Sequence, residues 1–89
     1  MKPLDYISKM RRSNPEVDLH GKRVQEAIDI LDVKIPEWLV AFDSAKIMYG
    51  HGTGQLKTGV VKYLRKHPSV REVLETPEGI RRGYVEILF

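Results

Sequence analysis

The sequence predicts an α/β fold, a two-layer sandwich in which two helices cover a mixed sheet with the order β-α-β-α-β-β. The first observation is a change of hydrophobic period, from alternation over residues 16–20 to steps of three and four residues from position 22 onward. The second is that each of the first two predicted strands runs into a predicted helix, which implies right-handed crossovers and a partly parallel sheet. The third is a segment rich in Pro and Gly between the last two apolar runs, which predicts that those strands pair antiparallel.

The first strand and the first helix follow from local patterns. Residues 16–20, EVDLH, alternate between polar and apolar and predict a short strand that Gly21 ends. From Lys22 to Phe42 the apolar residues recur at helical spacing. Pro36 removes one backbone hydrogen bond from this segment but leaves the phase of the pattern unchanged. We therefore expect one kinked helix rather than two separate ones.

The second half of the chain supplies the remaining elements. Residues 45–49 form a short apolar run that suits a buried strand, and a helical pattern from Leu56 ends before Pro68. Residues 70–75 and 84–89 are strand candidates, and the segment TPEGIRRG between them predicts a hairpin loop.

Length and composition limit the classes of protein. The 89 residues are enough for one core, and we expect residues 1–15 to form an arm or linker before a domain at 16–89. The absence of cysteine excludes disulfides and thiolate zinc sites and favours a reducing compartment. No apolar run reaches the roughly 20 residues that a membrane span needs, and residues 1–16 lack the apolar block of a signal peptide. We therefore expect a cytoplasmic protein without a membrane partner.

The charge is unevenly distributed along the chain. The net charge is +3, and the cations gather between residues 51 and 82 while the acids concentrate earlier. The basic side chains of this region are Lys57, Lys62, Arg65, Lys66, Arg71, Arg81 and Arg82. Such a distribution favours an anionic partner, with nucleic acid first. The alternative is a solvated surface without a partner.

A glycine-rich loop lies between the predicted strand at 45–49 and the helix that follows. It consists of Gly50, His51, Gly52, Thr53 and Gly54. Glycines let a phosphate approach the free N–H groups and the positive dipole at a helix N-terminus. The loop therefore predicts a phosphate cradle, with Thr53 as an added donor and Lys57 one turn into the helix. It matches neither the G-x-G-x-x-G nor the P-loop pattern, so we expect no nucleotide cofactor. The alternative is a tight turn that needs positive φ.

Asp18 and His20 form a second constellation. Residues two apart on a strand project to the same side, so the two polar side chains would lie together while Leu19 enters the core. A carboxylate beside a histidine can hold one tautomer for general acid/base catalysis. The alternative is a surface pair that caps the next helix. The three histidines of the chain show no zinc-site spacing, so we expect no metal.

Two separated segments together resemble one family. The segment VDLHGKRVQEAIDIL is similar to the LDLHG motif and first helix of the Smr domain, the small MutS-related domain. The segment IMYGHGTGQLKTGVVKYLRKHPSV is similar to that family's H-G-x-G-x-G motif, second helix and HP ending. The resemblance covers residues 16–89. It implies a compact fold similar to the C-terminal domain of bacterial translation initiation factor three.

The resemblance also implies a function. Family members bind nucleic acid, and many are endonucleases that nick DNA or cleave RNA, including messenger RNA at stalled ribosomes. The implied partners are RNA or branched DNA, the ribosome, and a MutS-type ATPase to which the domain is often fused. Asp18 and His20 match the motif to which cleavage is attributed, and Gly50, Gly52, Thr53 and Gly54 match the glycine loop. Tyr49 replaces the histidine that usually opens this loop, so the resemblance supports binding more strongly than cleavage.

We interpret the chain as a nucleic-acid-binding domain and an endonuclease that cleaves RNA or nicks structured DNA by metal-independent acid/base catalysis. Asp18 and His20 are the catalytic candidates. The binding candidates are Gly50, His51, Gly52, Thr53, Gly54, Lys57, Lys62, Arg65, Lys66, Arg81 and Arg82. The alternative is a non-catalytic binding module of a MutS-type ATPase that suppresses recombination.

Overall fold

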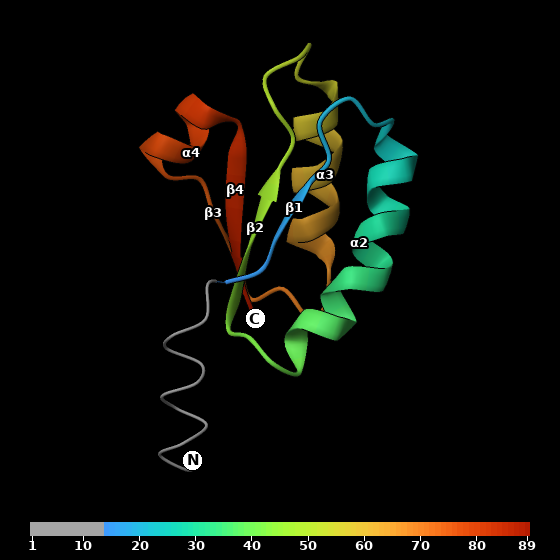
Figure 1. Ribbon diagram of the computed structural model, residues 1–89, viewed down its shortest axis with the longest axis vertical. Helices are drawn as coiled ribbons and strands as arrows, with labels where there is room; N and C mark the ends of the chain where they lie inside the picture. Colours follow the sequence, from blue (N-terminus) through green and yellow to red (C-terminus); the bar gives the residue numbers. More distant parts are fainter. Residues whose placement is uncertain (1–13) are drawn as a thin grey trace.

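The computed structural model describes residues 14–89, so all but the last two residues of the predicted arm lie outside it (Figure 1). The elements in chain order are β1 (Glu16–Asp18), α2 (Val24–Leu39), β2 (Ser44–Met48), α3 (Gln55–Lys66), β3 (Glu72–Leu74), α4 (Pro77–Arg82) and β4 (Tyr84–Leu88). None of the helices within residues 14–89 is long and apolar enough to cross a membrane.

The four strands form one mixed sheet in the order β1-β2-β4-β3. β1 pairs parallel to β2, with Val17 opposite Ile47. β4 pairs antiparallel to β2 on one side and to β3 on the other. The predicted mixed α/β sheet is therefore confirmed, including the antiparallel pairing of the last two strands. The crossover through α2 is the reason that β1 and β2 run in the same direction.

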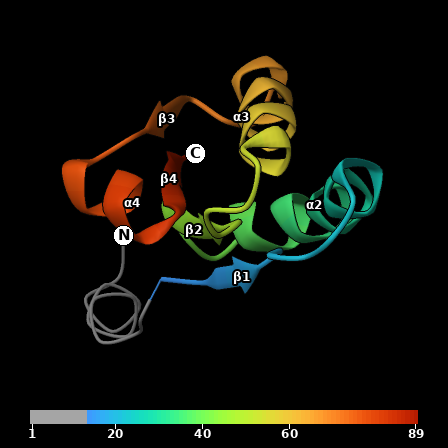
Figure 2. The same cartoon turned by 90° about the horizontal axis from the view of Figure 1, so that it is seen from above.

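α2 and α3 pack side by side on one face of the sheet (Figure 2). Their apolar stripes meet the inward-facing side chains of the two central strands. The largest fully buried side chains of this core are Leu19, Leu31, Ile35, Ile47, Val60, Leu64, Val85 and Ile87. α2 continues through Pro36 as a single helix, and α3 ends at Lys66, two residues before Pro68. The predictions of one helix through Pro36 and of a second helix that ends before Pro68 are therefore confirmed.

The predicted hairpin loop is wrong, because the segment TPEGIRRG contains the short helix α4. The fold therefore has three helices rather than two. The Thr76 hydroxyl accepts a hydrogen bond from the Gly79 N–H at 2.9 Å, and Pro77 occupies the first turn. Gly83 then ends the helix in the left-handed region, with φ of 80°. Thr, Pro and Gly are cap residues here, but the same residues are also typical of turns.

α4 lies on the face of the sheet opposite to α2 and α3 (Figures 1 and 2). Along β4, Val85 and Ile87 enter the core beneath the two long helices, whereas Tyr84 projects to the other side. The Tyr84 ring contacts Gly79 of α4, where a Cβ atom would lie 3.3 Å from the ring. The Nζ of Lys46 lies 4.4 Å from the centroid of the same ring.

The contact between α2 and α3 depends on a glycine. A Cβ atom on Gly59 would lie 2.5 Å from a γ-methyl of Val24, closer than side-chain atoms pack. The same interface carries a hydrogen bond in which the Tyr63 hydroxyl donates to the Asp32 carboxylate. Burial, together with this hydrogen bond, raises the pKa of the Tyr63 phenol. The glycine thus sets how closely the two helices approach.

We predict that Gly59→Ala lowers the free energy of unfolding by about 1 kcal/mol, as measured by urea denaturation. An overpacking cost of about 1–3 kcal/mol exceeds the gain of about 1 kcal/mol that alanine brings to a helix interior. In a Val24→Ala background the same change should instead stabilise the protein, because the clashing methyl groups are gone. If Gly59→Ala stabilised the unaltered chain, the close approach of the helices would not depend on this glycine.

Candidate functional site

An open cleft of about 590 Å³ lies where β1 and β2 end and α2 and α3 begin. It joins three segments: the turn after β1, the start of α2, and the glycine loop with the first residues of α3. The residues that line it are His20, Gly21, Lys22, Arg23, Val24, Tyr49, Gly50, His51, Gly52, Thr53, Gly54, Gln55, Leu56 and Lys57. The structure therefore brings His20, the whole glycine loop and Lys57 together in one place.

Asp18 and His20 are paired, although not as two positions of one strand. β1 ends at Asp18, and His20 lies in the turn that follows. The Oδ1 atom of Asp18 accepts two hydrogen bonds from His20, one from the backbone N–H at 3.0 Å and one from Nδ1 at 2.8 Å. Leu19 between them is fully buried, as predicted. The carboxylate therefore fixes both the backbone and the ring of the histidine.

This pairing determines the protonation of the imidazole. The hydrogen bonds from His20, first from its side chain and then from its backbone, lower the pKa of the Asp18 carboxyl below 3.8. Asp18 is therefore ionised near neutral pH and can only accept hydrogen bonds. It follows that Nδ1 of His20 carries a proton. In the neutral ring the lone pair then resides on Nε2, which has no partner among residues 14–89.

The first glycine of the loop is held between two segments. A Cβ atom on Gly50 would lie 3.2 Å from the Cβ of His20, and Gly50 adopts φ of 78°. On its other side, a Cβ on Gly83 would lie 2.8 Å from the Gly50 backbone. The Gly83 carbonyl accepts from the N–H groups of Tyr49 at 2.9 Å and Gly50 at 3.0 Å. The tight turn at positive φ, which is the alternative to a phosphate cradle, is therefore present at Gly50.

The rest of the loop keeps its backbone donors free. The N–H groups of Gly52, Thr53 and Gly54 donate to no other group of residues 14–89. The Thr53 hydroxyl accepts from the Gln55 N–H at 3.4 Å, a local side-chain-to-backbone bond at the turn into α3. Gly52 and Gly54 both have positive φ and open space around the position of a Cβ. The loop therefore presents unpaired donors at the start of a helix dipole.

His51 connects this loop to α4. Its Nε2 donates to the backbone carbonyl of Arg81 at 2.6 Å, which leaves Nδ1 as the acceptor of the neutral ring. Arg81 and Arg82 each form an ion pair with Glu78 of their own helix, at 3.4 and 3.8 Å. His51 therefore has a structural bond that the sequence did not suggest, because its partner is thirty residues away.

The predicted basic residues divide into two groups. The first group, Lys57, Lys62, Arg65 and Lys66, lies on α3, and the second, Arg81 and Arg82, lies on α4. α3 and α4 lie on opposite faces of the sheet, so the two groups are carried by elements on different faces (Figure 2). Helical spacing places Lys62, Arg65 and Lys66 on one helix face, and a hairpin loop at 76–83 would bring Arg81 and Arg82 close to that face. This prediction is wrong, because Arg81 and Arg82 belong to α4, which lies on the other face of the sheet.

Tyr49 occupies the position just before the glycine loop. It is only 5% exposed and belongs to the hydrophobic core, although it also contributes to the wall of the cleft. Burial, and secondarily the negative charge of Glu75, raises the pKa of its phenol above 10.0. Its hydroxyl therefore stays neutral near neutral pH.

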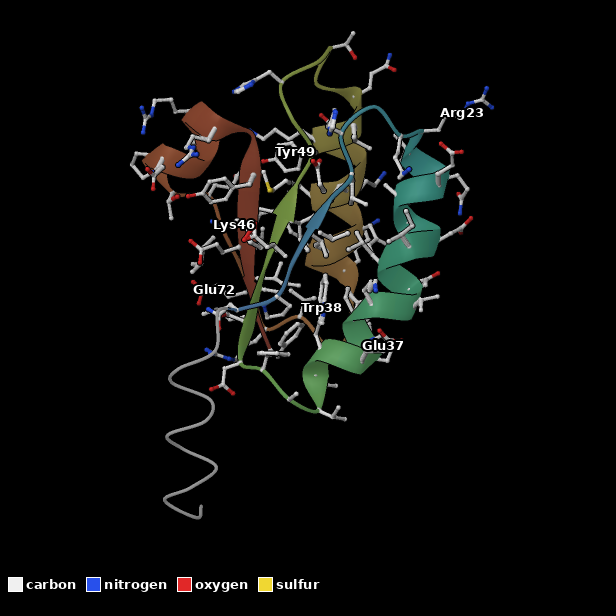
Figure 3. All side chains as sticks on the ribbon, viewed as in Figure 1. Arg23, Glu37, Trp38, Lys46, Tyr49 and Glu72 are labelled. Carbon is white, nitrogen blue, oxygen red and sulfur yellow. The ribbon has the colours of Figure 1, made fainter. Side chains whose placement is uncertain are left out.

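Lys22 and Arg23 line the cleft but were not among the predicted site residues. Figure 3 shows Arg23 at the start of α2, at the same end of the molecule as Tyr49. Their position directly after the Asp-Leu-His-Gly segment was the signal that could have identified them. Within residues 14–89, no group of three or more His, Asp or Glu side chains is arranged to hold a metal ion.

The arrangement matches a known family. The family model of the Smr domain matches residues 17–83, which includes both motifs and most of the described chain. The chain belongs to the Smr domain family. The resemblance drawn from the Asp-Leu-His-Gly and glycine-loop segments is thereby confirmed.

Known proteins support the same assignment for this Smr domain. A protein named Endonuclease MutS2 from Staphylococcus epidermidis is 35% identical over 74 residues, which is 80% of this chain and 10% of that protein. One of the same name from Helicobacter pylori is 31% identical over 87 residues, 97% of this chain and 11% of that protein. The chain thus spans about a tenth of the length of these relatives.

The fold is also found in a solved structure. The crystal structure of the Smr domain of Thermus thermophilus MutS2 superposes with a TM-score of 0.74 and 27% identity. The match covers 83% of this chain and 95% of that one. The α/β fold predicted from the sequence is therefore the fold of the Smr domain.

We predict that the Asp18 carboxyl titrates with a midpoint below 3.8, as measured by NMR. Because the folded-state pKa is lowered, Asp18 contributes stability that is fully present above the unfolded pKa and is lost as the pH falls through the folded pKa. The difference in unfolding free energy between the unaltered chain and Asp18→Asn should therefore be constant near neutral pH and shrink below pH 3.8. A midpoint at or above 3.8 would contradict the paired geometry.

Proposed function

We propose that this Smr domain is an endonuclease that binds a nucleic-acid phosphate in the cleft and cleaves RNA by metal-independent acid/base catalysis. One observation carries the proposal: a carboxylate-oriented histidine lies in the same cleft as a loop with unpaired backbone donors. The names of the relatives, Endonuclease MutS2, support a nuclease role. Structured DNA is the second substrate class that the same cleft would admit.

The free N–H groups of Gly52, Thr53 and Gly54 would bind the non-bridging oxygens of a phosphate. Lys22 and Lys57 line the cleft near them and would contribute positive charge without a fixed geometry. Gly50 does not take part, because its N–H is bonded to Gly83. The binding part of the site therefore consists of the last three loop residues and the cations around them.

His20 would act as the base. Its Nε2 would take the proton of a ribose 2′-hydroxyl, and the 2′-oxygen would attack the adjacent phosphorus. The bond from phosphorus to the 5′-oxygen would break, and the leaving oxygen would take a proton from solvent. Asp18 would hold the ring and stabilise the imidazolium that forms. Since the substrate supplies the nucleophile, the reaction needs no nucleophilic side chain.

The second candidate is a binding module without catalysis, fused to a MutS-type ATPase. Two observations favour it. The chain covers about a tenth of the MutS2 relatives, and Tyr49 is a buried neutral phenol where the family commonly has a histidine. We also propose a cytoplasmic location, which the absence of cysteine favours, and the ribosome as a partner, which the resemblance to the Smr family implies.

We predict that His20→Ala lowers the rate of RNA cleavage on the order of 10²–10⁴-fold, because the proton acceptor is lost. Asp18→Asn should also slow cleavage, since the imidazole loses its orienting carboxylate. The assay uses a labelled oligoribonucleotide and identifies the products by mass. They should carry 2′,3′-cyclic phosphate ends, a 2′-deoxy substitution at the cut should block cleavage, and EDTA should have little effect.

His67→Ala is the matched control for this experiment, because His67 lies at the far end of α3, outside the cleft, where its ring accepts a bond from the Ser69 N–H and packs edge-on against Tyr63. Cleavage at full rate by His20→Ala would reject the catalytic assignment. If the unaltered chain binds RNA and DNA but cuts neither, the binding-module candidate is favoured.

We predict that Gly52→Val weakens RNA binding by roughly 10- to 100-fold, the equivalent of one lost hydrogen bond to a charged group. A β-branched residue resists the positive φ that Gly52 adopts and changes the path of the loop. Thr53→Ala removes only a hydroxyl, keeps the backbone donors and should have a smaller effect. Binding is measured by fluorescence anisotropy, with circular dichroism to verify folding. Undiminished binding by folded Gly52→Val would show that the loop is only a turn.

A further inference from the structure

A groove of about 440 Å³ runs along the exposed surface of α3, outside the cleft. Its lining residues belong to two neighbouring rows at i, i+4 spacing. Lys57, Val61 and Arg65 form one row, and Thr58, Lys62 and Lys66 form the other. Val61 and the aliphatic stems of the basic residues supply apolar surface, and the four cations lie on both sides of it.

The four cations differ in their partners. Glu75, which follows β3, contacts Lys57 at 3.4 Å and Arg65 at 3.3 Å. One carboxylate thus holds both cations of the first row, on either side of Val61. Lys62 and Lys66 in the second row are exposed and have no ion pair with any group of residues 14–89. An anion would therefore meet two free cations and two that are already paired.

The groove adjoins the cleft, since Lys57 lines both. From Lys57 to Lys66 the helix rises about 14 Å, at 1.5 Å per residue. A strand of B-form geometry carries one phosphate per 3.4 Å, so this length corresponds to roughly four phosphates. A row of cations that starts at the proposed phosphate pocket and follows a helix axis suits a linear polyanion better than an isolated phosphate.

We propose that the groove along α3 binds the polynucleotide strand that flanks the phosphate in the cleft, and that the Glu75 carboxylate is the internal anion which this strand displaces. The proposal rests on the proposed function, since it uses the cleft as the starting point of the strand. It assigns contact with the strand to α3, whereas Arg81 and Arg82 on the other face of the sheet would not contact the same segment.

The test measures binding without cleavage. The probe is a labelled single-stranded 2′-O-methyl oligonucleotide of about twelve residues, whose affinity is measured by anisotropy at several salt concentrations. For single strands, each phosphate contact contributes about 0.7 to the slope of log affinity against log salt. Lys62→Ala/Lys66→Ala should therefore weaken binding and reduce the slope by about 1.4. Glu75→Gln keeps the shape of the side chain but releases Lys57 and Arg65, so it should tighten binding and steepen the slope.

Lys34→Glu is the matched control, because it changes the net charge by the same two units as the double alanine variant. Lys34 is exposed on α2, two residues beyond Asp32, which faces α3 through its bond with Tyr63. At 100° per residue, Lys34 is therefore turned well away from α3. If net charge alone weakened binding, Lys34→Glu would weaken it as much as Lys62→Ala/Lys66→Ala does. If the groove contacts the strand, Lys34→Glu should leave affinity and salt slope nearly unchanged.

The outcomes separate the two proposals. If the unaltered chain binds with a steep salt slope but Lys62→Ala/Lys66→Ala behaves like Lys34→Glu, the groove inference is overturned and the proposed function stands. Weaker binding by Glu75→Gln would overturn the role of its carboxylate as a competitor. A poly-glutamate peptide that binds as tightly as the oligonucleotide at equal salt would indicate an acidic protein partner instead. A chain that binds no oligonucleotide would overturn both the inference and the proposed function.

Discussion

The contact between the backbones of Gly50 and Gly83 is the constraint on which the site depends. A single carbonyl, that of Gly83, accepts the N–H groups of both Tyr49 and Gly50, and no side chain would fit between the two segments. This junction holds the residues that follow β2 next to the residue that precedes β4. It also directs the following residues outward, so that their N–H groups stay unpaired. His51 can then reach the carbonyl of Arg81, and His20 rests against the other side of Gly50.

The two histidines of the cleft illustrate how backbone placement determines chemistry. His20 donates a hydrogen bond from Nδ1 to a carboxylate and leaves Nε2 unpaired, whereas His51 donates from Nε2 to a backbone carbonyl. The first bond is made to a charge and leaves the outer nitrogen available. The second joins two segments of the chain. Residues of one type, close in space, are thus suited to different tasks by the groups that face them.

Much of this could be predicted from the sequence where the signal is local. Hydrophobic period identified the strands and both long helices, and residue spacing paired Asp18 with His20. α4 was missed because its six residues are fewer than two turns and show no period, while Thr76, Pro77 and Gly83 are equally typical of a turn. The ion pairs of Glu75 and the bond from His51 to Arg81 join residues that only the tertiary fold brings together.

The junction at Gly83 has a consequence for the order in which the site forms during synthesis. The residues of the cleft, from His20 to Lys57, all precede Gly83 in the chain, yet the conformation of their loop depends on its carbonyl. A nascent chain that has been synthesised only through β1, α2, β2 and α3 therefore contains all the cleft residues but lacks the Gly83 carbonyl that fixes the glycine loop. Because long-range pairing of this kind forms late, the site becomes competent only once β4 has docked. A partly synthesised domain would not yet hold the glycine loop in this conformation.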